Sequence, residues 1–316
     1  MSGTNYWLPS ALPRTFAACE RDVSSDKADV RASAVSDLVA HTRDPETRTK
    51  SLELLAAALE DPEARVRARA AIALADGDGG HVHTDALITA VGDADDEVRQ
   101  LAITALGEIG DERAIPRLLR AAEDERASMR YQAVIALARL EIDDELRTKV
   151  LLRATSDDDF NIRYIAMRLA EEHFAPDETK PAPERLRLRA VAMLDDDERD
   201  VTVAAAIFLG HAGDDRGKPL LRRVVRAEIP AQREDEREAV ELVGALGMRD
   251  LMPDLEKRAF GIARHVRDTC SFHALIALAR MGHEGAIARI RRDLASKNEK
   301  RREAAAIAAS RAHLDG

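Results

Sequence analysis

Residues 93–116 read DADDEVRQLAITALGEIGDERAIP, and this stretch decides the fold of the chain. Its apolar side chains at Val98, Ala102, Ala105 and Leu106 follow the spacing i, i+4, i+7 and i+8. Because an α-helix has about 3.6 residues per turn, this spacing places all four on one helix face. A strand would need apolar residues at alternate positions. The pattern therefore predicts an amphipathic helix.

The same pattern recurs along the chain at a regular interval. Five segments carry an arginine after an apolar residue, and the arginines are separated by 36, 32, 31 and 33 residues. They are Arg31, Arg67, Arg99, Arg130 and Arg163. A helical pattern repeated at this period is typical of stacked supersecondary units. The sequence therefore predicts an all-α repeat protein.

Two further landmarks indicate where the helices of each unit begin and end. An aspartate stands six residues before four of the arginines, at a position suited to capping a helix: Asp61, Asp93, Asp124 and Asp157. Three glycines each have a proline six residues later, which suits a helix end followed by a first helical turn: Gly110 and Pro116, Gly213 and Pro219, Gly247 and Pro253. Each unit is predicted to be a helix, a tight turn, a second helix and a glycine break.

These features resemble the HEAT family, in its short bacterial form with phycobilisome-lyase-type HEAT-like repeats. The resemblance rests on Asp93-x5-Arg99 with the following alanines and Leu106, and on the break at 109–116, and it covers about residues 28–315. It implies a right-handed α-solenoid (α-α superhelix) of about eight HEAT-like helical hairpins. It also implies a structural ladder of aspartates and arginines between successive repeats: Asp61, Arg67, Asp93, Arg99, Asp124, Arg130, Asp157 and Arg163.

The pattern changes after Arg163, where the equivalent positions become Thr202, Ala239 and Ser271. We therefore expect an N-terminal capping segment at 1–23, a regular sub-array at 24–172, a proline-rich loop at 173–184, and a divergent sub-array with a basic C-terminal cap at 185–316. The loop is either a joint that contacts a partner or simply marks where the later repeats have drifted in sequence. The capping segment is expected to form a short amphipathic helix through Trp7, Leu8, Leu12 and Phe16, with partner recruitment as the alternative.

Composition excludes several classes of protein. Aromatic residues make up 3% of the 316 residues, which is few for one large centralised core, and charged residues make up 34%. No apolar run is long enough to cross a bilayer, and the first twenty residues lack the pattern of a secretory signal. Cys19 and Cys270 are too few for a disulfide framework or a cysteine metal site. We expect a cytoplasmic protein without a membrane span.

Charge is unevenly distributed along the chain, whose net charge is −10. Residues 251–316 carry 13 Lys and Arg against 8 Asp and Glu. A possible anionic-partner patch lies there: Arg289, Arg291, Arg292, Lys297, Lys300, Arg301 and Arg302. These residues could contact nucleic acid, an acidic protein segment or anionic lipid, or they could only keep the open end of the array soluble.

The second helices are expected to line the concave face of the array. Residues one and five positions after the repeat arginine share a face opposed to the apolar stripe. They predict a partner-binding row: Gln100, Thr104, Tyr131, Ile135, Tyr164 and Arg168. Tyr131 and Tyr164 occupy the same repeat position and could form an aromatic patch, or they could pack between consecutive helices.

No catalytic constellation stands out, so we expect no catalytic residue, no cofactor and no bound metal. The pair His81 and His83 follows a glycine-rich stretch but lacks the further ligands of a zinc site. Enzymes on HEAT-like repeats include deoxyhypusine hydroxylase, but its repeated His-Glu pairs are absent, since His283-Glu284 falls in a turn. The hypothesis is a non-catalytic scaffold or adaptor binding a protein or peptide on its concave face. The alternatives are nucleic-acid binding at the basic end, or a HEAT-like enzyme such as a lyase or metal-dependent hydroxylase.

Overall fold

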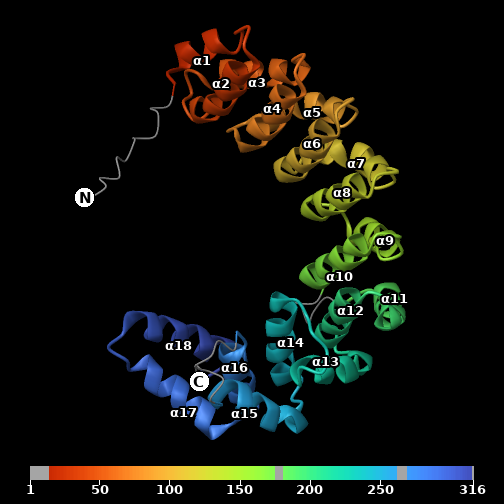
Figure 1. Ribbon diagram of the computed structural model, residues 1–316, viewed down its shortest axis with the longest axis vertical. Helices are drawn as coiled ribbons and strands as arrows, with labels where there is room; N and C mark the ends of the chain where they lie inside the picture. The colour runs from red at the N-terminus through yellow and green to blue at the C-terminus, as the bar shows by residue number, and fades with distance from the viewer. Residues whose placement is uncertain (1–13, 175–180, 262–268, 315–316) are drawn as a thin grey trace, which may run out of the picture. The chain divides into compact units, whose positions relative to one another are not determined.

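The computed structural model describes residues 14–174, 181–261 and 269–314, and within these ranges it consists of α-helices joined by short 3-10 helices and turns, with no strand (Figure 1). The expected all-α repeat fold is therefore confirmed. The chain divides into two compact units, Met1–Val150 (unit 1) and Leu151–Gly316 (unit 2). The boundary between them falls within helix α9, Asp144–Ala154. Each unit is described separately.

Unit 1 alternates short first helices with longer second helices. The first helices are α1 (Phe16–Asp22), α3 (Arg48–Ala57), α5 (Thr84–Ala90) and α7 (Ile115–Ala121). The second helices are α2 (Ala28–His41), α4 (Ala64–Asp76), α6 (Asp96–Ile109) and α8 (Ala127–Arg139). Each second helix packs on the next, so α2, α4, α6 and α8 form one layer whose apolar stripes face the first helices.

Unit 2 continues the same alternation. Its first helices are α11 (Glu184–Ala192), α13 (Lys218–Val225), α15 (Met252–Phe260) and α17 (Glu284–Leu294). Its second helices are α10 (Phe160–Phe174), α12 (Arg199–His211), α14 (Arg233–Ala245), α16 (Ser271–Arg280) and α18 (Glu299–Arg311). Helices α10, α12, α14, α16 and α18 pack in that order. In chain order the described helices make nine pairs, one more than expected, because α1 packs on α2 as the first helix of a pair.

Small residues bring the second helices close together. A Cβ atom added to Gly107 on α6 would lie 2.7 Å from Cα of Ala136 on α8, which is closer than real Cβ contacts. Alanine and glycine at such crossings let the backbones approach, and the core is filled by alanine and aliphatic side chains instead of aromatic rings. This close packing explains the low aromatic content of the sequence.

The predicted helix ends are confirmed. Gly110, Gly213 and Gly247 adopt left-handed φ angles of 72°, 70° and 62°. Each following proline occupies the first turn of a helix: Pro116 in α7, Pro219 in α13 and Pro253 in α15. Proline fits there because its missing N–H would have had no intrahelical partner.

The turn aspartates cap in a different place from the one expected. Asp93 stands two residues before the N-cap of α6, which is Asp95, and its Oδ1 accepts a hydrogen bond from the Asp95 amide at 2.8 Å. Asp61, Asp124 and Asp157 make the same bond to the amide two residues ahead. The side chain therefore fixes the turn that leads into the helix, as an Asx turn, and not the first turn of the helix itself.

Several predictions lie outside the described residues: Trp7, Leu8 and Leu12 of the capping segment, and residues 175–180 of the proline-rich loop. The division at 173–184 therefore stays a prediction. Among the described helices, none combines the length and apolar character that a bilayer-spanning segment requires.

Candidate functional site

Ion pairs join the second helix of one repeat to the turn of the next. Arg67 on α4 donates from Nε and Nη2 to the carboxylate of Asp93 at 2.7 and 2.8 Å. Its Nη1 donates to the main-chain oxygen of Asp61 in its own turn at 2.7 Å. The hydrogen bonds from Arg67 hold the pKa of the Asp93 carboxyl below its ordinary value. One guanidinium thus fastens two successive turns.

Two further pairs have the same geometry. Arg31 donates to both oxygens of Asp61 at 2.7 and 2.8 Å, and Arg163 donates to both oxygens of Asp196 at 2.9 Å. Neither Arg31 nor Asp196 was in the predicted ladder. The signal was present for both, because Arg31 is the first arginine of the repeat and Asp196 stands six residues before Thr202.

Arg99 departs from this arrangement. Its guanidinium forms an ion pair with Asp96 on its own helix and donates to the main-chain oxygen of Asp93 at 2.5 Å. The carboxylate of Asp124, the expected partner, lies beside Arg126 instead, at 3.5 Å. The reason is local: three residues before Arg99 the sequence has an acid, whereas three residues before the other four arginines it has Ala28, Ala64, Ala127 and Phe160.

The last described helix, α18, has an arginine equivalent to the repeat arginines, Arg302. Arg302 on α18 donates from Nη1 to the main-chain oxygens of Ser296 and Lys297 at 2.9 and 3.1 Å. Arg130 makes the same two contacts with the main-chain oxygens of Asp124 and Glu125, each at 3.0 Å. Arg302 is therefore a structural arginine at this end of the array, in addition to being part of the predicted basic patch.

The predicted partner-binding row is divided between the two units. Gln100, Thr104, Tyr131 and Ile135 lie half-buried on α6 and α8 of unit 1. The hydroxyl of Thr104 donates to the main-chain oxygen of Gln100 at 3.0 Å. Tyr164 and Arg168 lie on α10 of unit 2. The pairing of Tyr131 with Tyr164 stays a prediction.

In unit 2, Tyr164 and Arg168 take part in a polar cluster that sequence reasoning missed. The hydroxyl of Tyr164 donates to Oδ1 of Asp235 at 3.1 Å. Asp235 lies in the first turn of α14 and is fully buried, and burial raises its pKa. Arg168 Nη1 lies 2.7 Å from Oε2 of Glu171, and Nη2 donates to Oε2 of Glu238 at 2.6 Å.

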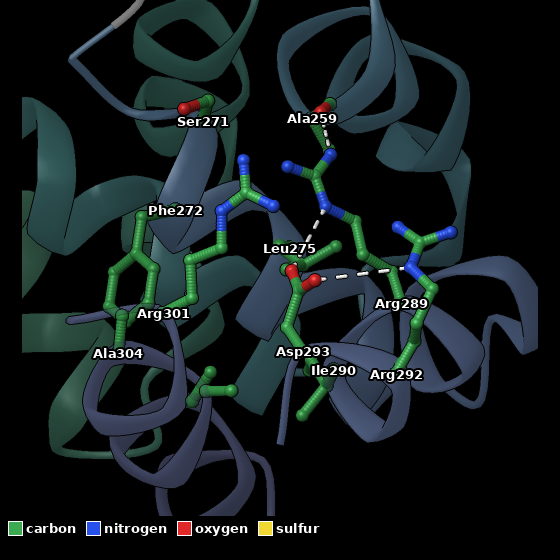
Figure 2. A pocket seen from close by; sticks show the side chains of 12 residues that line it. Ala259, Ser271, Phe272, Leu275, Arg289, Ile290, Arg292, Asp293, Arg301 and Ala304 are labelled. Atoms are coloured by element: carbon green, nitrogen blue, oxygen red, sulfur yellow. Dashed lines mark hydrogen bonds and ion pairs between the residues drawn. The ribbon is translucent and has the colours of Figure 1, made fainter. Parts of the chain in front are cut away.

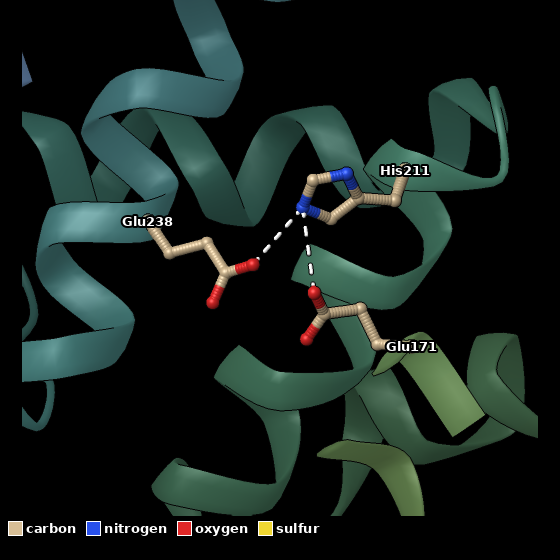
Figure 3. Close-up of side chains that lie close together, drawn as sticks. All are labelled: Glu171, His211 and Glu238. Atoms are coloured by element: carbon tan, nitrogen blue, oxygen red, sulfur yellow. Dashed lines mark hydrogen bonds and ion pairs between the residues drawn. The ribbon is translucent and has the colours of Figure 1, made fainter. Parts of the chain in front are cut away.

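His211, at the end of α12, faces the same two glutamates from the other side (Figure 3). Its Nε2 lies 3.0 Å from Oε1 of Glu238 and 3.6 Å from Oε1 of Glu171. Burial raises the pKa of Glu171, and the neighbouring carboxyl of Glu238 raises it further. Burial also opposes ionisation of Glu238, but hydrogen bonds from His211 and Glu171 and the charge of Arg168 outweigh burial and lower its pKa. The contact between the two carboxyl groups therefore shifts their pKa values in opposite directions.

This cluster borders a hollow of about 800 Å³ on the second helices of unit 2, here called the inner hollow. It is lined by side chains of α10, α12, α14 and α16 and by the end of α18, and many of them are charged. A second acid–histidine pair stands in it: Nδ1 of His273 lies 3.1 Å from Oε2 of Glu241, which also accepts a hydrogen bond from Arg311 at 3.1 Å.

A second pocket of about 480 Å³ lies among α15, α16, α17 and α18, here called the C-terminal pocket. Figure 2 shows the side chains of Arg289, Arg292 and Arg301 gathered around it, with Asp293 between them. Apart from Ser271, the rest of the lining is apolar: Ala259, Phe272, Leu275, Ile290, Ala304, Ala305 and Ala308. Three members of the predicted basic patch therefore line one pocket.

The arginines of the C-terminal pocket are held loosely. Arg289 donates to the main-chain oxygen of Ala259 at 3.3 Å, and its guanidinium carbon lies 6.0 Å from the centre of the Phe260 ring. The carboxylate of Asp293 lies 3.8 Å from Arg289 Nε and 3.9 Å from Arg292 Nε. Arg289 and Arg292 thus share one distant carboxylate.

The other predicted residues of the basic patch lie on the surface around the pocket. Arg291, Lys297 and Lys300 are exposed and do not line it. The pair His81 and His83 belongs to a short 3-10 helix, Gly80–His83, between α4 and α5. Among the described residues, the His, Cys, Asp and Glu side chains close enough together to hold a metal ion are Glu171, His211 and Glu238.

Comparison with known proteins identifies the repeat. The family model of HEAT repeats matches residues 84–170, which confirms the resemblance to HEAT repeats there; the short bacterial form stays a prediction. The crystal structure of YibA from Escherichia coli is similar, with a TM-score of 0.61 at 17% identity over 86% of this chain and 93% of YibA. An engineered protein of known structure aligns over 94% of this chain and 88% of its own, with a TM-score of 0.48 and 17% identity. At 17% identity the likeness to YibA shows the fold alone. No curated protein matches the sequence.

Proposed function

Since this chain carries HEAT repeats, we propose that it is a non-catalytic scaffold whose C-terminal pocket binds an acidic, partly apolar segment of a partner protein. A stack of helical hairpins presents extended surfaces to partners. The single observation that supports this proposal most is the C-terminal pocket itself, where three arginines stand over an apolar wall.

The charges favour an anionic group in this pocket. Among the described residues, three arginines but only one carboxylate, Asp293, line the pocket, so it carries an excess positive charge. Asp293 lies 3.8 Å from Arg289 and 3.9 Å from Arg292. The Arg301 guanidinium has no side-chain partner among the described residues. An incoming carboxylate can accept two parallel hydrogen bonds from such a group, which gives arginine its preference for carboxylates.

The apolar wall favours a protein segment over a nucleic acid. Leu275, Ile290 and Ala308 are buried but reach the pocket surface, and Phe272 is half-buried beside them. A leucine or isoleucine next to an aspartate or glutamate would bury its side chain on this wall while the carboxylate meets the arginines. Single-stranded nucleic acid is held by several stacked aromatic rings, whereas Phe272 is the aromatic residue that lines this pocket.

The proposal is tested by fluorescence anisotropy with a labelled peptide of glutamates and leucines in alternation, and the same peptide with lysine for glutamate as the probe control. We expect the acidic peptide to bind and the basic peptide not to bind. R292Q and R301Q should each weaken binding roughly 10-fold or more, since a charged hydrogen bond contributes about 1.5–3 kcal/mol.

Arg291→Gln is the matched control, because Arg291 lies on the same helix, is exposed and does not line the pocket. Its affinity should stay within about twofold of the wild type. Absence of binding by the wild type, or an equal loss in R291Q, would contradict the proposal. If a labelled DNA duplex binds more strongly than the acidic peptide and R301Q abolishes that binding, the partner is nucleic acid and the proposal is wrong.

A further inference from the structure

We propose that Glu171, His211 and Glu238 form a binding site for one divalent transition-metal ion such as Zn²⁺. The three side chains come from α10, α12 and α14 of unit 2, and they offer one ligand atom each within a group no wider than 4.8 Å. The proposal is independent of the C-terminal pocket, which is made by other helices.

The spacing of the ligand atoms fits such an ion. Nitrogen and oxygen bind zinc at about 2.0–2.1 Å, so ligand atoms around a tetrahedral ion stand roughly 3.3 Å apart. Nε2 of His211 lies 3.0 Å from Oε1 of Glu238 and 3.6 Å from Oε1 of Glu171. One imidazole with two carboxylates is a donor set that suits zinc or manganese, since imidazole favours the first and carboxylate the second.

Arg168 holds the two carboxylates in a ligating orientation. Its guanidinium contacts the Oε2 atoms of Glu171 and Glu238 at 2.7 and 2.6 Å, whereas the Oε1 atoms of both face His211 (Figure 3). The outer oxygen of Glu238 is therefore held by a hydrogen bond and that of Glu171 by an ion pair, and the inner oxygens are directed at the imidazole. Metal-ligating carboxylates are usually held by a second layer of hydrogen bonds of this kind.

The charge of the cluster also favours a cation. Asp235 stands behind Arg168, with Oδ1 3.8 Å from Nη1, so three carboxylates surround one guanidinium. Asp235 is fully buried, and its Oδ2 has no hydrogen-bond partner among the described residues. Metal ligands bind in the deprotonated form, so a divalent cation would displace the proton that burial favours on Glu171 and would balance the charge of the two glutamates.

The site has room for a further ligand. Arg168, His211 and Glu238 all line the inner hollow, so an ion held by three protein atoms would keep a coordination position open towards this 800 Å³ space. Zinc with three protein ligands and one open position takes water or another small ligand there, whereas closed structural sites use four protein ligands. The geometry thus points to an ion that is accessible from the hollow.

The experiment is isothermal titration of the full chain with ZnCl₂ near neutral pH, after treatment with a chelator and dialysis. We expect one Zn²⁺ per chain. H211A and E238Q should each lower the affinity by roughly 100-fold, because each removes one of three ligands. Substitution of Co²⁺ supplies a second readout, since its visible absorption band reports direct coordination and should be lost in H211A.

His273→Ala is the matched control. His273 pairs with Glu241 in the same hollow but belongs to a set without a third ligand among the described residues, so H273A should bind Zn²⁺ like the wild type. His211 is exposed, so H211A is expected to fold, and its circular dichroism melt verifies this. Absence of Zn²⁺ binding in the wild type, or equal binding by the wild type and a folded H211A, would overturn the proposal.

Discussion

The hydroxyl of Tyr164 on α10 donates a hydrogen bond at 3.1 Å to Asp235 on α14, a residue 71 positions later in the chain. Helix α12 stands between these helices in the packing order of unit 2, so the bond joins second helices that are two repeats apart. In a stack where each repeat mainly contacts its neighbours, such a bond adds a non-neighbour constraint. It also supplies the donor for a carboxylate that is fully buried.

We therefore predict that Tyr164→Phe destabilises the protein by about 1–3 kcal/mol, because Asp235 loses its donor while remaining buried. Urea unfolding followed by circular dichroism measures the effect. Tyr131→Phe is the control, since Tyr131 is the half-buried tyrosine at the same repeat position in unit 1. Equal effects of the two substitutions would show that the Asp235 contact contributes no stability.

Asp93→Asn should destabilise the protein by about 1–2 kcal/mol, and Asp124→Asn by less than about 0.5 kcal/mol. Asparagine can keep the turn bond to the amide two residues ahead in both variants, so the comparison isolates the ion pair. Asp93 accepts two hydrogen bonds from Arg67, whereas Asp124 lies 3.5 Å from the exposed Arg126. Chemical denaturation measures the free energy of unfolding of both variants. A larger loss of stability in D124N than in D93N would contradict this interpretation.

The ionised ladder carboxylates stabilise the folded protein, so stability should fall in acid, where they become protonated. The pKa values of Asp61, Asp93 and Asp196 are lowered in the folded state. A lowered folded pKa means that the contribution is complete above the unfolded value of about 3.9 and is lost as pH falls through the folded value. The melting temperature of the wild type should therefore fall steeply below about pH 4.

The variant D93N serves as the control for this pH dependence. It already lacks one ladder carboxylate, so the difference in melting temperature between wild type and D93N should shrink as the pH falls. A difference that is constant with pH would mean that the charge of Asp93 does not contribute.

Gly107→Ala should destabilise the protein by about 1–3 kcal/mol, although alanine favours a helix more than glycine does. The added Cβ would lie 2.7 Å from the backbone of Ala136, so α6 and α8 would have to separate. Glu108→Ala on the exposed side of α6 is the control and should change stability by less than about 0.5 kcal/mol. Thermal unfolding measures the melting temperature of both variants. A higher melting temperature in G107A than in the wild type would show that α6 and α8 can move apart without loss of stability.

The repeat positions show which structural features a local sequence pattern predicts. The apolar stripe from Val98 to Leu106, the left-handed Gly110 and Pro116 each depend on a few neighbouring residues, and all three were predicted correctly. The ladder was harder to predict at Arg99, because two carboxylates compete for one guanidinium. Asp96, three residues before Arg99 in the sequence, forms the ion pair in place of Asp124.

By itself the sequence determined the helical repeat, the helix ends and the basic character of the C-terminal end, because these features follow from residues within a turn or two of one another. Only the tertiary structure brought Glu171, His211 and Glu238 together, since they come from three helices with no motif linking them. It also turned Arg289, Arg292 and Arg301 towards one pocket with an apolar wall. The physical reason is that helix packing decides which helix faces lie against one another. The spacing of residues along the chain does not determine this packing.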